Sequence, residues 1–258
     1  MKNIALLLRY DGTNYHGWQS QKNGDTIQDT VSDAITRLTG AKPLPELHGV
    51  GRTDAGVHAL NYVANFLSET RIPVDRLPYA LKQYLPDDIS VLAATEAAPD
   101  FHARFSCLEK RYFYKIYSAR TPDPFMKHRA YFSPIPLDVP LMQKAAARVV
   151  GKHNFSCFQA TGSPTKTSVR TVTQCQVETD RDGTIIISVA ADGFLYNMVR
   201  IISGTLYYVG LHKLSPDDVT KMIESGDRLE AGVTLPPYGL YLERAWYPEE
   251  CFIGGELL

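Results

Sequence analysis

The segment from His48 to Tyr62, HGVGRTDAGVHALNY, stands out as a group of residues that could carry chemistry. Three glycines surround an arginine, a threonine, a carboxylate and a histidine: Gly49, Gly51, Gly56, Arg52, Thr53, Asp54 and His58. Glycines at this density permit positive φ and let a ligand approach the backbone closely. A carboxylate held in place on a tight connection is a competent nucleophile. The structural alternative is a glycine-rich hairpin turn in which Asp54 satisfies local backbone donors.

Other common catalytic and metal-binding patterns do not occur in the sequence. The segment lacks the GxxxxGK[ST] of a phosphate loop and the GxGxxG-plus-helix fingerprint of a dinucleotide site. The seven histidines show no HxxxH or HExxH spacing and the four cysteines form no CxxC pair, so we predict neither a metal site nor a disulfide framework. Ser156 and Ser203 lack the context of a nucleophile elbow, which argues against a serine hydrolase.

Basic and aromatic residues alternate in KRYFYK, residues 110–115. On a strand, the side chains point to opposite faces, with Arg111, Phe113 and Lys115 on one and Lys110, Tyr112 and Tyr114 on the other. This pattern suits RNA, whose unstacked bases lie on aromatic rings while Lys and Arg meet its phosphates. The alternative is a half-exposed strand whose Tyr and Phe side chains belong to the core.

Arg200 lies within an apolar segment, ADGFLYNMVRIISGTL, residues 191–206. A buried guanidinium needs a partner because an unpaired buried charge is costly. A carboxylate is the natural partner, and the contact is bidentate where the geometry allows it. Two alternatives remain: Arg200 reaches the surface, or it pairs with a nearby structural acid such as Asp192.

The net charge of −1 is unevenly distributed. Residues 101–131 hold seven Lys or Arg against two acids, whereas residues 214–258 hold nine acids against three bases. A basic block of this kind indicates either a polyanion-binding face or a solvated surface. No apolar run reaches the roughly 18 residues of a membrane span, and the N-terminus lacks a signal-peptide pattern. We therefore expect a cytoplasmic protein with no membrane partner.

Hydrophobic periodicity predicts the same order of elements twice. In the first half we expect strands at 4–10, 46–51, 60–67 and 89–96, with helices at 26–39 and 74–84. In the second half we expect strands at 107–118, 170–179, 183–191 and 240–247, with helices at 138–150, 195–209 and from Ser215. Thr26 with Asp29 resembles a capping box, and Gly40 stands where a helix-ending glycine belongs.

Two β-α-β-β-α-β units predict an α+β fold with two ferredoxin-like halves related by a pseudo-twofold. We expect mostly antiparallel sheets that flank a central basic cleft. Residues 1–100 form the expected first domain, which carries Asp54. Residues 101–258 form the expected second domain, which carries Tyr112 and Arg200.

The motif GRTDAGVHA (51–59) resembles the catalytic motif of TruA-type tRNA pseudouridine synthases. Further segments match that family's motifs in the same order: RYDGTNYHGWQSQ (9–21), FHARFSCLEKRYFYKIY (101–117), HNFSCF (153–158), GFLYNMVRIISGTL (193–206) and PPYGLYLERAWYP (236–248). The resemblance therefore covers the whole chain. One departure is Cys107, where the family commonly has Ala.

The resemblance implies a homodimer that isomerises uridine to pseudouridine in the tRNA anticodon stem-loop, at positions 38, 39 and 40, without cofactor or metal. It implies that Asp54 is the nucleophile, that Tyr112 stacks on the target base and relays its proton, and that Arg200 pairs with the catalytic aspartate. It further implies that Arg52 handles the flipped-out target nucleotide and that Leu240 or Leu242 packs against its base. Lys110 and Arg111 would contact the RNA.

The chemistry agrees with these roles. Pseudouridine formation breaks the N1–C1′ bond, turns the uracil and rejoins it through C5, so no redox cofactor is required. The carboxylate attacks C1′ or C6, and the sequence leaves both open. Two other functions compete: a non-catalytic RNA-binding protein or tRNA chaperone on the same fold, and an enzyme of another class that uses Asp54 on a small substrate. The complete set Asp54, Tyr112 and Arg200 favours the synthase.

Overall fold

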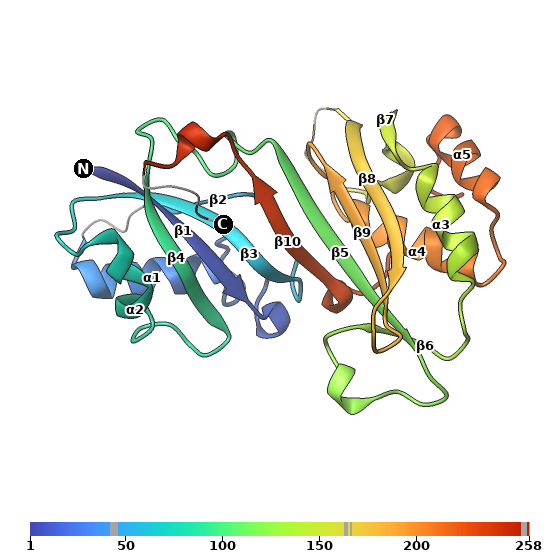
Figure 1. Cartoon of the computed structure of the whole chain (residues 1–258), viewed down its shortest axis with the longest axis horizontal. Helices are drawn as coiled ribbons and strands as arrows, with labels where there is room; N and C mark the ends of the chain where they lie inside the picture. The colour runs from blue at the N-terminus through green and yellow to red at the C-terminus, as the bar shows by residue number, and fades with distance from the viewer. Residues whose placement is uncertain (42–45, 163–164, 166, 254–256, 258) are drawn as a thin grey trace. The chain divides into compact units, whose positions relative to one another are not determined.

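The computed structural model describes residues 1–41, 46–162, 165, 167–253 and 257. The chain folds into two compact units (Figure 1). The first unit comprises Met1–Leu108 and Leu242–Leu258, and the second comprises Glu109–Tyr241. The sequence predicts a boundary after residue 100, whereas the units divide after Leu108 and the C-terminal segment belongs to the first unit.

The first unit has the expected order of strands and helices. Its elements are β1 (Lys2–Tyr10), α1 (Ile27–Thr39), β2 (His48–Gly49), β3 (His58–Ser68), α2 (Leu77–Leu81) and β4 (Ile89–Ala97). Strand β1 pairs with both β3 and β4, β2 pairs with β3, and all three pairings are antiparallel.

Helix α1 begins and ends where its sequence predicts. Its buried residues Ile27, Val31, Ala34 and Ile35 follow the period of one helical face. The Thr26 hydroxyl accepts a hydrogen bond from the Asp29 backbone N–H at 3.1 Å. Gly40 then ends the helix in the left-handed region, at φ 69°.

Helix α2 is shorter than the predicted 74–84. A 3-10 turn occupies Val74–Arg76, and the α-helix covers only Leu77–Leu81. Pro86 follows closely in the sequence and disfavours helical backbone at the residue before it. After Leu81 the chain continues in turns, in which the Tyr84 and Leu85 N–H groups donate to the Leu81 carbonyl at 3.0 and 3.1 Å.

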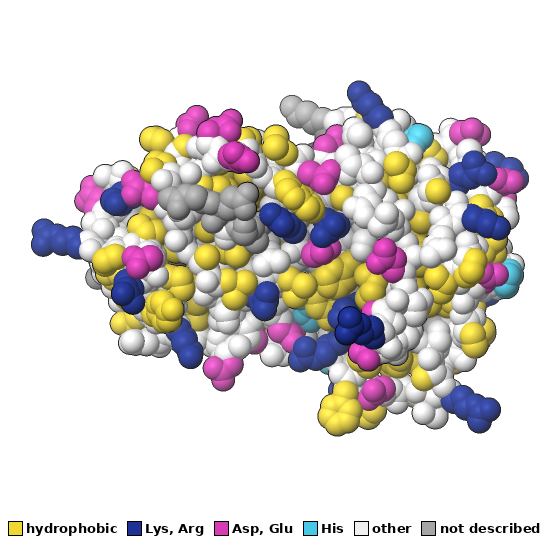
Figure 2. Space-filling view, viewed as in Figure 1, with side chains coloured by type: hydrophobic (Ala, Val, Ile, Leu, Met, Phe, Trp, Pro, Cys, Tyr) yellow, Lys and Arg dark blue, Asp and Glu magenta, His cyan; other side chains and the backbone are white. Residues whose placement is uncertain are grey.

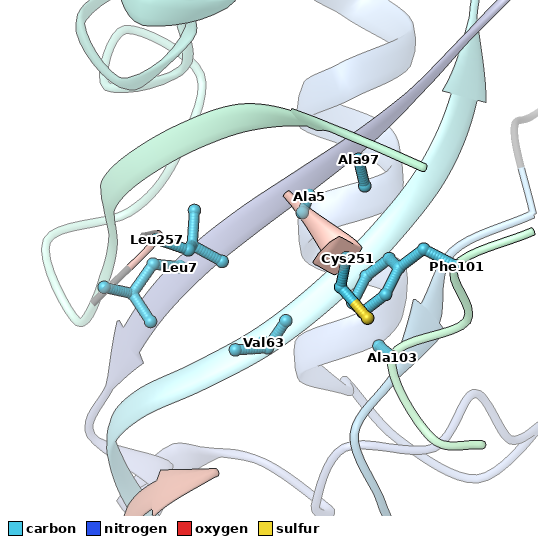
Figure 3. Close-up of a cluster of buried hydrophobic side chains, with 8 residues drawn as sticks. All are labelled: Ala5, Leu7, Val63, Ala97, Phe101, Ala103, Cys251 and Leu257. Carbon is cyan, nitrogen blue, oxygen red and sulfur yellow. The ribbon is translucent and has the colours of Figure 1, made fainter. Parts of the chain in front are cut away.

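Strand β1 is buried on both faces of its sheet. Ile4, Leu6 and Leu8 on one face are 0% exposed. On the other face, Ala5 and Leu7 belong to a cluster around β1 and β3 (Figure 3). Its other buried members come from β3, β4, the segment after β4 and the C-terminus: Val63, Ala97, Phe101, Ala103, Cys251 and Leu257. Burial on both faces explains why β1 reads as a continuous apolar run.

The second unit also combines a sheet with helices. Its elements are β5 (Glu109–Ser118), β6 (Tyr131–Ser133), α3 (Val139–Ala147), β7 (Gly151–Asn154), β8 (Val169–Thr179), β9 (Ile185–Ala191), α4 (Met198–Gly210) and α5 (Pro216–Ser225). The order β5-β9-β8-β7 is antiparallel throughout, and β6 runs parallel to β5. The fold is therefore α+β with mixed, mostly antiparallel pairing. Strand β10 (Leu240–Trp246) begins in this unit and ends in the first.

Local signals predict most helix starts of the second unit. Ser215 and Asp218 form a complete capping box at the start of α5. Asp138 caps α3 by accepting from the Leu141 N–H at 2.9 Å. Helix α4 begins three residues later than predicted because Asn197 adopts the left-handed region, at φ 60°. Strands β6 and β7 are short, and the apolar pattern does not predict them.

The surface carries both signs of charge. On the face shown in Figure 2, basic and acidic side chains are interspersed, as expected for a net charge of −1. Among the described residues, no helix has the length and apolar character needed to cross a membrane.

Candidate active site

Asp54 lies half-buried on the loop Val50–Val57, which connects β2 to β3. Within the loop, the Val57 N–H donates to the Asp54 carbonyl at 3.1 Å. Gly56 adopts φ 77°, which a side chain would disfavour. Its N–H donates to the Tyr15 carbonyl at 3.3 Å, so the loop is also bound from outside. The sequence prediction of a tight glycine-rich connection between two strands is confirmed.

The segment Tyr10–Gln19 holds this loop from one side. The Trp18 N–H donates to the Thr53 carbonyl at 3.1 Å. The Tyr10 and Thr53 hydroxyls lie 2.9 Å apart and are buried. Both residues that flank Asp54 on its N-terminal side are thus engaged, since Arg52 Nε donates to Gln19 Oε1 at 3.1 Å.

Two glycines permit this close approach. A Cβ added to Gly12 would lie 2.0 Å from the Val57 carbonyl oxygen. A Cβ added to Gly17, which has φ +86°, would lie 2.3 Å from the Thr53 carbonyl oxygen. Real Cβ atoms do not come this near to backbone, so only glycine fits at these two positions of the N-terminal segment.

An aromatic pair supports the start of the loop. The rings of Trp18 and Tyr62 stack with centroids 4.1 Å apart. The Tyr62 hydroxyl donates to the Gly51 carbonyl at 2.5 Å. At the far end of the loop, His58 is 3% exposed and its Nδ1 accepts from the Gly12 N–H at 3.1 Å. The loop is therefore fixed at its start, middle and end.

Sequence reasoning assigns no individual role to Tyr10, Gly12, Gly17 or Trp18, although they lie within a family motif. The signal that could have found them is the pair of glycines interleaved with aromatics in RYDGTNYHGW. Such spacing predicts a segment that approaches another backbone closely while burying large rings. Its target could not be inferred, because the loop lies about 40 residues further along the chain.

Tyr112 lies on β5 of the second unit, opposite Val189 of β9. It is 8% exposed, and its ring meets Phe194 edge-on at 5.1 Å. Tyr114 on the same face is fully buried and donates to the Pro236 carbonyl at 2.8 Å. The tyrosine face of this strand is thus largely core, while Lys110 and Arg111 are half-buried.

The opposite face of β5 is also ordered by aromatic contacts. Phe113 stacks on Tyr241 at 4.8 Å with an interplanar angle of 11°. The Lys115 ammonium lies over both rings, 5.7 Å from the first and 5.2 Å from the second. The predicted interleaving of basic and aromatic residues therefore exists as cation–π contacts within the unit.

Arg200 lies half-buried on the first turn of α4. Its Nε donates to the Leu235 carbonyl at 2.7 Å, and its Nη1 donates to Asn197 Oδ1 at 2.6 Å. Asp192, the local structural acid, accepts from the Thr171 backbone N–H at 3.0 Å. The bonds from Arg200 to Leu235 and Asn197 orient the guanidinium through neutral oxygens of its own unit.

The candidate residues are distributed over both units. Arg52 and Asp54 share one loop of the first unit. Tyr112, Arg200, Lys110 and Arg111 belong to the second unit. Leu240 and Leu242, both buried, lie on β10 at the point where the chain passes from the second unit to the first. Among the residues that the structure describes, no group of three His, Cys, Asp or Glu is placed to hold a metal ion.

Comparison with known proteins identifies the family. The model of the tRNA pseudouridine synthase family matches residues 7–106 and 145–248. A tRNA pseudouridine synthase A from Acetivibrio thermocellus is 49% identical over 247 residues, covering 96% of this chain and 100% of that protein. One from a Thermoanaerobacter species is 47% identical over 247 residues, with the same coverage.

Among solved structures, a Cbf5–Nop10–Gar1 complex is similar at 11% identity and a TM-score of 0.36, covering 95% of this chain and 58% of that chain. The sequence relatives, and not this structural likeness, decide the assignment. Near half-identity over almost the full length, together with a family model that spans the Asp54 loop, shows that the chain belongs to the tRNA pseudouridine synthase family.

Proposed function

We propose that Asp54 is the nucleophile with which this tRNA pseudouridine synthase, an isomerase, converts uridines 38, 39 and 40 of the anticodon stem-loop. The observation that carries the proposal is the fixed loop around Asp54. Neighbouring backbone at Thr53, Gly56 and Val57 is hydrogen-bonded or in close contact, so the backbone that carries the carboxylate is held in place. A nucleophile gains most from such positioning, because the cost of orienting it is met during folding.

The isomerisation balances without an external oxidant or reductant. The N1–C1′ bond breaks and a C5–C1′ bond forms. The proton that leaves C5 is matched by the proton that N1 gains. Asp54 supplies an oxygen that attacks either C1′ or C6, and the chain must retain the detached uracil while it turns. An aromatic platform and an apolar wall serve that purpose.

Tyr112 and Arg200 are proposed to complete the site. Tyr112 would stack on the target base and relay its proton through its hydroxyl. Arg200 would pair with Asp54 and keep the carboxylate ionised. The support for Arg200 is its orientation, since two of its nitrogens donate to Leu235 and Asn197. A guanidinium has five N–H groups, so it can serve several partners at once, a carboxylate among them.

The remaining assignments concern RNA. Arg52 is exposed beside Asp54 and is proposed to handle the flipped-out nucleotide. Leu240 or Leu242 would pack against its base. Lys110 and Arg111, at the start of β5, are proposed to meet the phosphates, where each lysine or arginine contact adds salt-dependent affinity.

We also infer that the chain consists of two ferredoxin-like halves related by a pseudo-twofold around a basic cleft. The first unit supports this because the order β4-β1-β3-β2 is that of a ferredoxin-like sheet. In the second unit, the order β5-β9-β8 repeats the order β1-β3-β2. A homodimer is proposed from the family resemblance. Because the substrate is tRNA, we expect the protein to act in the cytoplasm.

Release of tritium from tRNA labelled at uridine C5 tests the function. We expect release with the wild type and none with Asp54→Ala, while that variant still binds tRNA. Release of tritium by Asp54→Ala would refute the assignment of Asp54 as the nucleophile. Binding of tRNA without release by the wild type would instead support the non-catalytic RNA-binding alternative, and absence of binding at low salt would support a small-molecule substrate.

A further inference from the structure

Three rings from two segments of the first unit lie in a row, and the last of them is exposed to solvent. His48 of β2 stacks on His102 with centroids 4.4 Å apart and an interplanar angle of 29°. His102 in turn meets Phe105 at 4.4 Å and 42°. Phe105 is 75% exposed, and the Arg104 guanidinium carbon lies 5.5 Å from its centroid. We call His48, His102 and Phe105 the ring ladder.

The loop that carries the ladder is rigidly held. The Ser106 N–H donates to the His102 carbonyl at 2.9 Å, and the His102 N–H donates to Ser106 Oγ at 3.1 Å. The Ala103 N–H donates at 2.8 Å to Oδ1 of Asn65, a buried residue of β3. An ordered turn therefore presents Phe105 to solvent.

The surroundings of the imidazole in the middle of the ladder favour its neutral form. Burial, followed by the nearby His48, lowers the pKa of His102. Its Nδ1 accepts from the Arg104 backbone N–H at 3.1 Å, as an unprotonated nitrogen does. The two imidazoles lie face to face, an arrangement for stacking and not for convergence on a metal ion. Phe105 thus ends this row of rings, tilted against His102, with the Arg104 guanidinium over its ring.

A second copy of this chain is a poor occupant for the exposed end. A twofold contact centred on this patch would bring Arg104 near its own equivalent, so that two positive charges would face each other. The patch also begins the basic stretch 101–131, which has seven bases and two acids. A planar ring attached to a negatively charged backbone can pack on the exposed Phe105 ring and meet the Arg104 guanidinium at the same time.

We propose that Phe105 is a stacking platform for an unpaired nucleobase of the tRNA, with Arg104 at the adjacent phosphate. This base is separate from the target uridine, for which Tyr112 is the proposed platform. The inference rests on the proposed function, because it takes tRNA as the ligand. It assigns the exposed ring to substrate affinity and leaves the chemistry at Asp54 unaffected.

Binding of unmodified tRNA by Phe105→Ala tests the proposal against two matched variants. Phe105→Trp keeps a stacking ring, and Tyr79→Ala removes a ring that is 73% exposed on α2 of the same unit. Loss of one base–aromatic stack predicts a Kd for Phe105→Ala that is about tenfold higher. Both matched variants should bind like the wild type. In tritium release, Phe105→Ala should show a raised KM and an unchanged kcat.

Arg104→Gln should weaken binding and reduce the slope of log K against log salt by about one. An unchanged Kd for Phe105→Ala would overturn the proposal. So would a shift of that variant to a smaller species in sedimentation, which would assign Phe105 to a contact between copies. Failure of the proposed function looks different, because the wild type itself would then neither bind tRNA nor release tritium.

Discussion

The hydroxyl oxygens of Tyr10 and Thr53 lie 2.9 Å apart in a buried contact that joins the end of β1 to the residue before Asp54. Tyr10 is 3% exposed, and its ring lies 5.5 Å from that of Tyr62. The position of the proposed nucleophile is thus set by a side chain more than 40 residues earlier in the chain. Tyr10 is a positioning residue in this arrangement and does not itself touch the reacting atoms.

Tyr10→Phe should therefore lower both activity and stability. The ring and its packing remain, but a buried Thr53 hydroxyl loses its partner, which costs about 1–3 kcal/mol. Because the lost bond orients the Asp54 loop, we expect the single-turnover rate constant of tritium release to fall about tenfold. The Kd for tRNA should be unchanged. Thr53→Ser keeps a hydroxyl and should retain most of the rate. Equal rates for Tyr10→Phe and wild type would show that the ring alone positions the loop.

Two glycine variants distinguish the cost of backbone strain from the cost of a steric clash. They are Gly17→Ala and Gly40→Ala. Both glycines have positive φ, +86° and +69°, and alanine in this region costs about 1–2 kcal/mol. A Cβ at Gly40 meets nothing within 4 Å, whereas one at Gly17 meets the Thr53 carbonyl at 2.3 Å and the Asp54 carbonyl carbon at 3.0 Å. We expect thermal unfolding to show a moderate loss for Gly40→Ala with full activity.

For Gly17→Ala, the free energy of unfolding should fall further and tritium release should be nearly abolished, because the Asp54 loop must move. Similar unfolding temperatures and rates for the two variants would mean that the loop shifts without consequence. That result would contradict the close packing between the N-terminal segment and the loop.

Local patterns predict much of this fold because they depend on neighbours in sequence. Helix α1 follows from its apolar period and from Thr26 and Gly40. The hairpin of β8 and β9 follows from two apolar runs around DRDG. Strands β6 and β7 escape prediction because they are three and four residues long and gain their structure from pairing with β5 and β8. Their sequences alone carry no strand period.

The candidate site divides in the same way. Glycine density and the family resemblance single out the Asp54 loop in advance. The contacts of Gly12, Gly17 and Trp18 with that loop depend on folding that brings distant segments together. Arg200 illustrates a third case: its apolar surroundings predict a need for partners, yet two of its hydrogen bonds lead to a backbone carbonyl and to Asn197, which no charge pattern would reveal.

Asn65 offers a test of the support beneath the ring ladder. Its side chain donates to Asn3 Oδ1 at 2.9 Å and accepts from the Ala103 N–H at 2.8 Å, all within the buried part of the first unit. Asn65→Leu leaves these polar groups without partners, so we expect the free energy of unfolding to fall by about 2–4 kcal/mol in urea denaturation. Asn61→Ala, which removes a half-buried bond to the Glu243 carbonyl, should cost about 1 kcal/mol. A smaller loss for Asn65→Leu than for Asn61→Ala would refute this role.

Arg200→Lys should keep the positive charge and lose the two directed hydrogen bonds of the guanidinium. The guanidinium reaches the Leu235 carbonyl and Asn197 Oδ1 in two directions at once, whereas an ammonium on a flexible stem is a single point of charge. We expect kcat in tritium release to fall at least about 100-fold and the free energy of unfolding to fall by about 1–3 kcal/mol. Asn197→Gly keeps the left-handed backbone and removes one of the two bonds, so it should lower kcat by a smaller factor. If Arg200→Lys retained the wild-type rate, charge alone would suffice at this position and the proposed fixed pairing with Asp54 would be wrong.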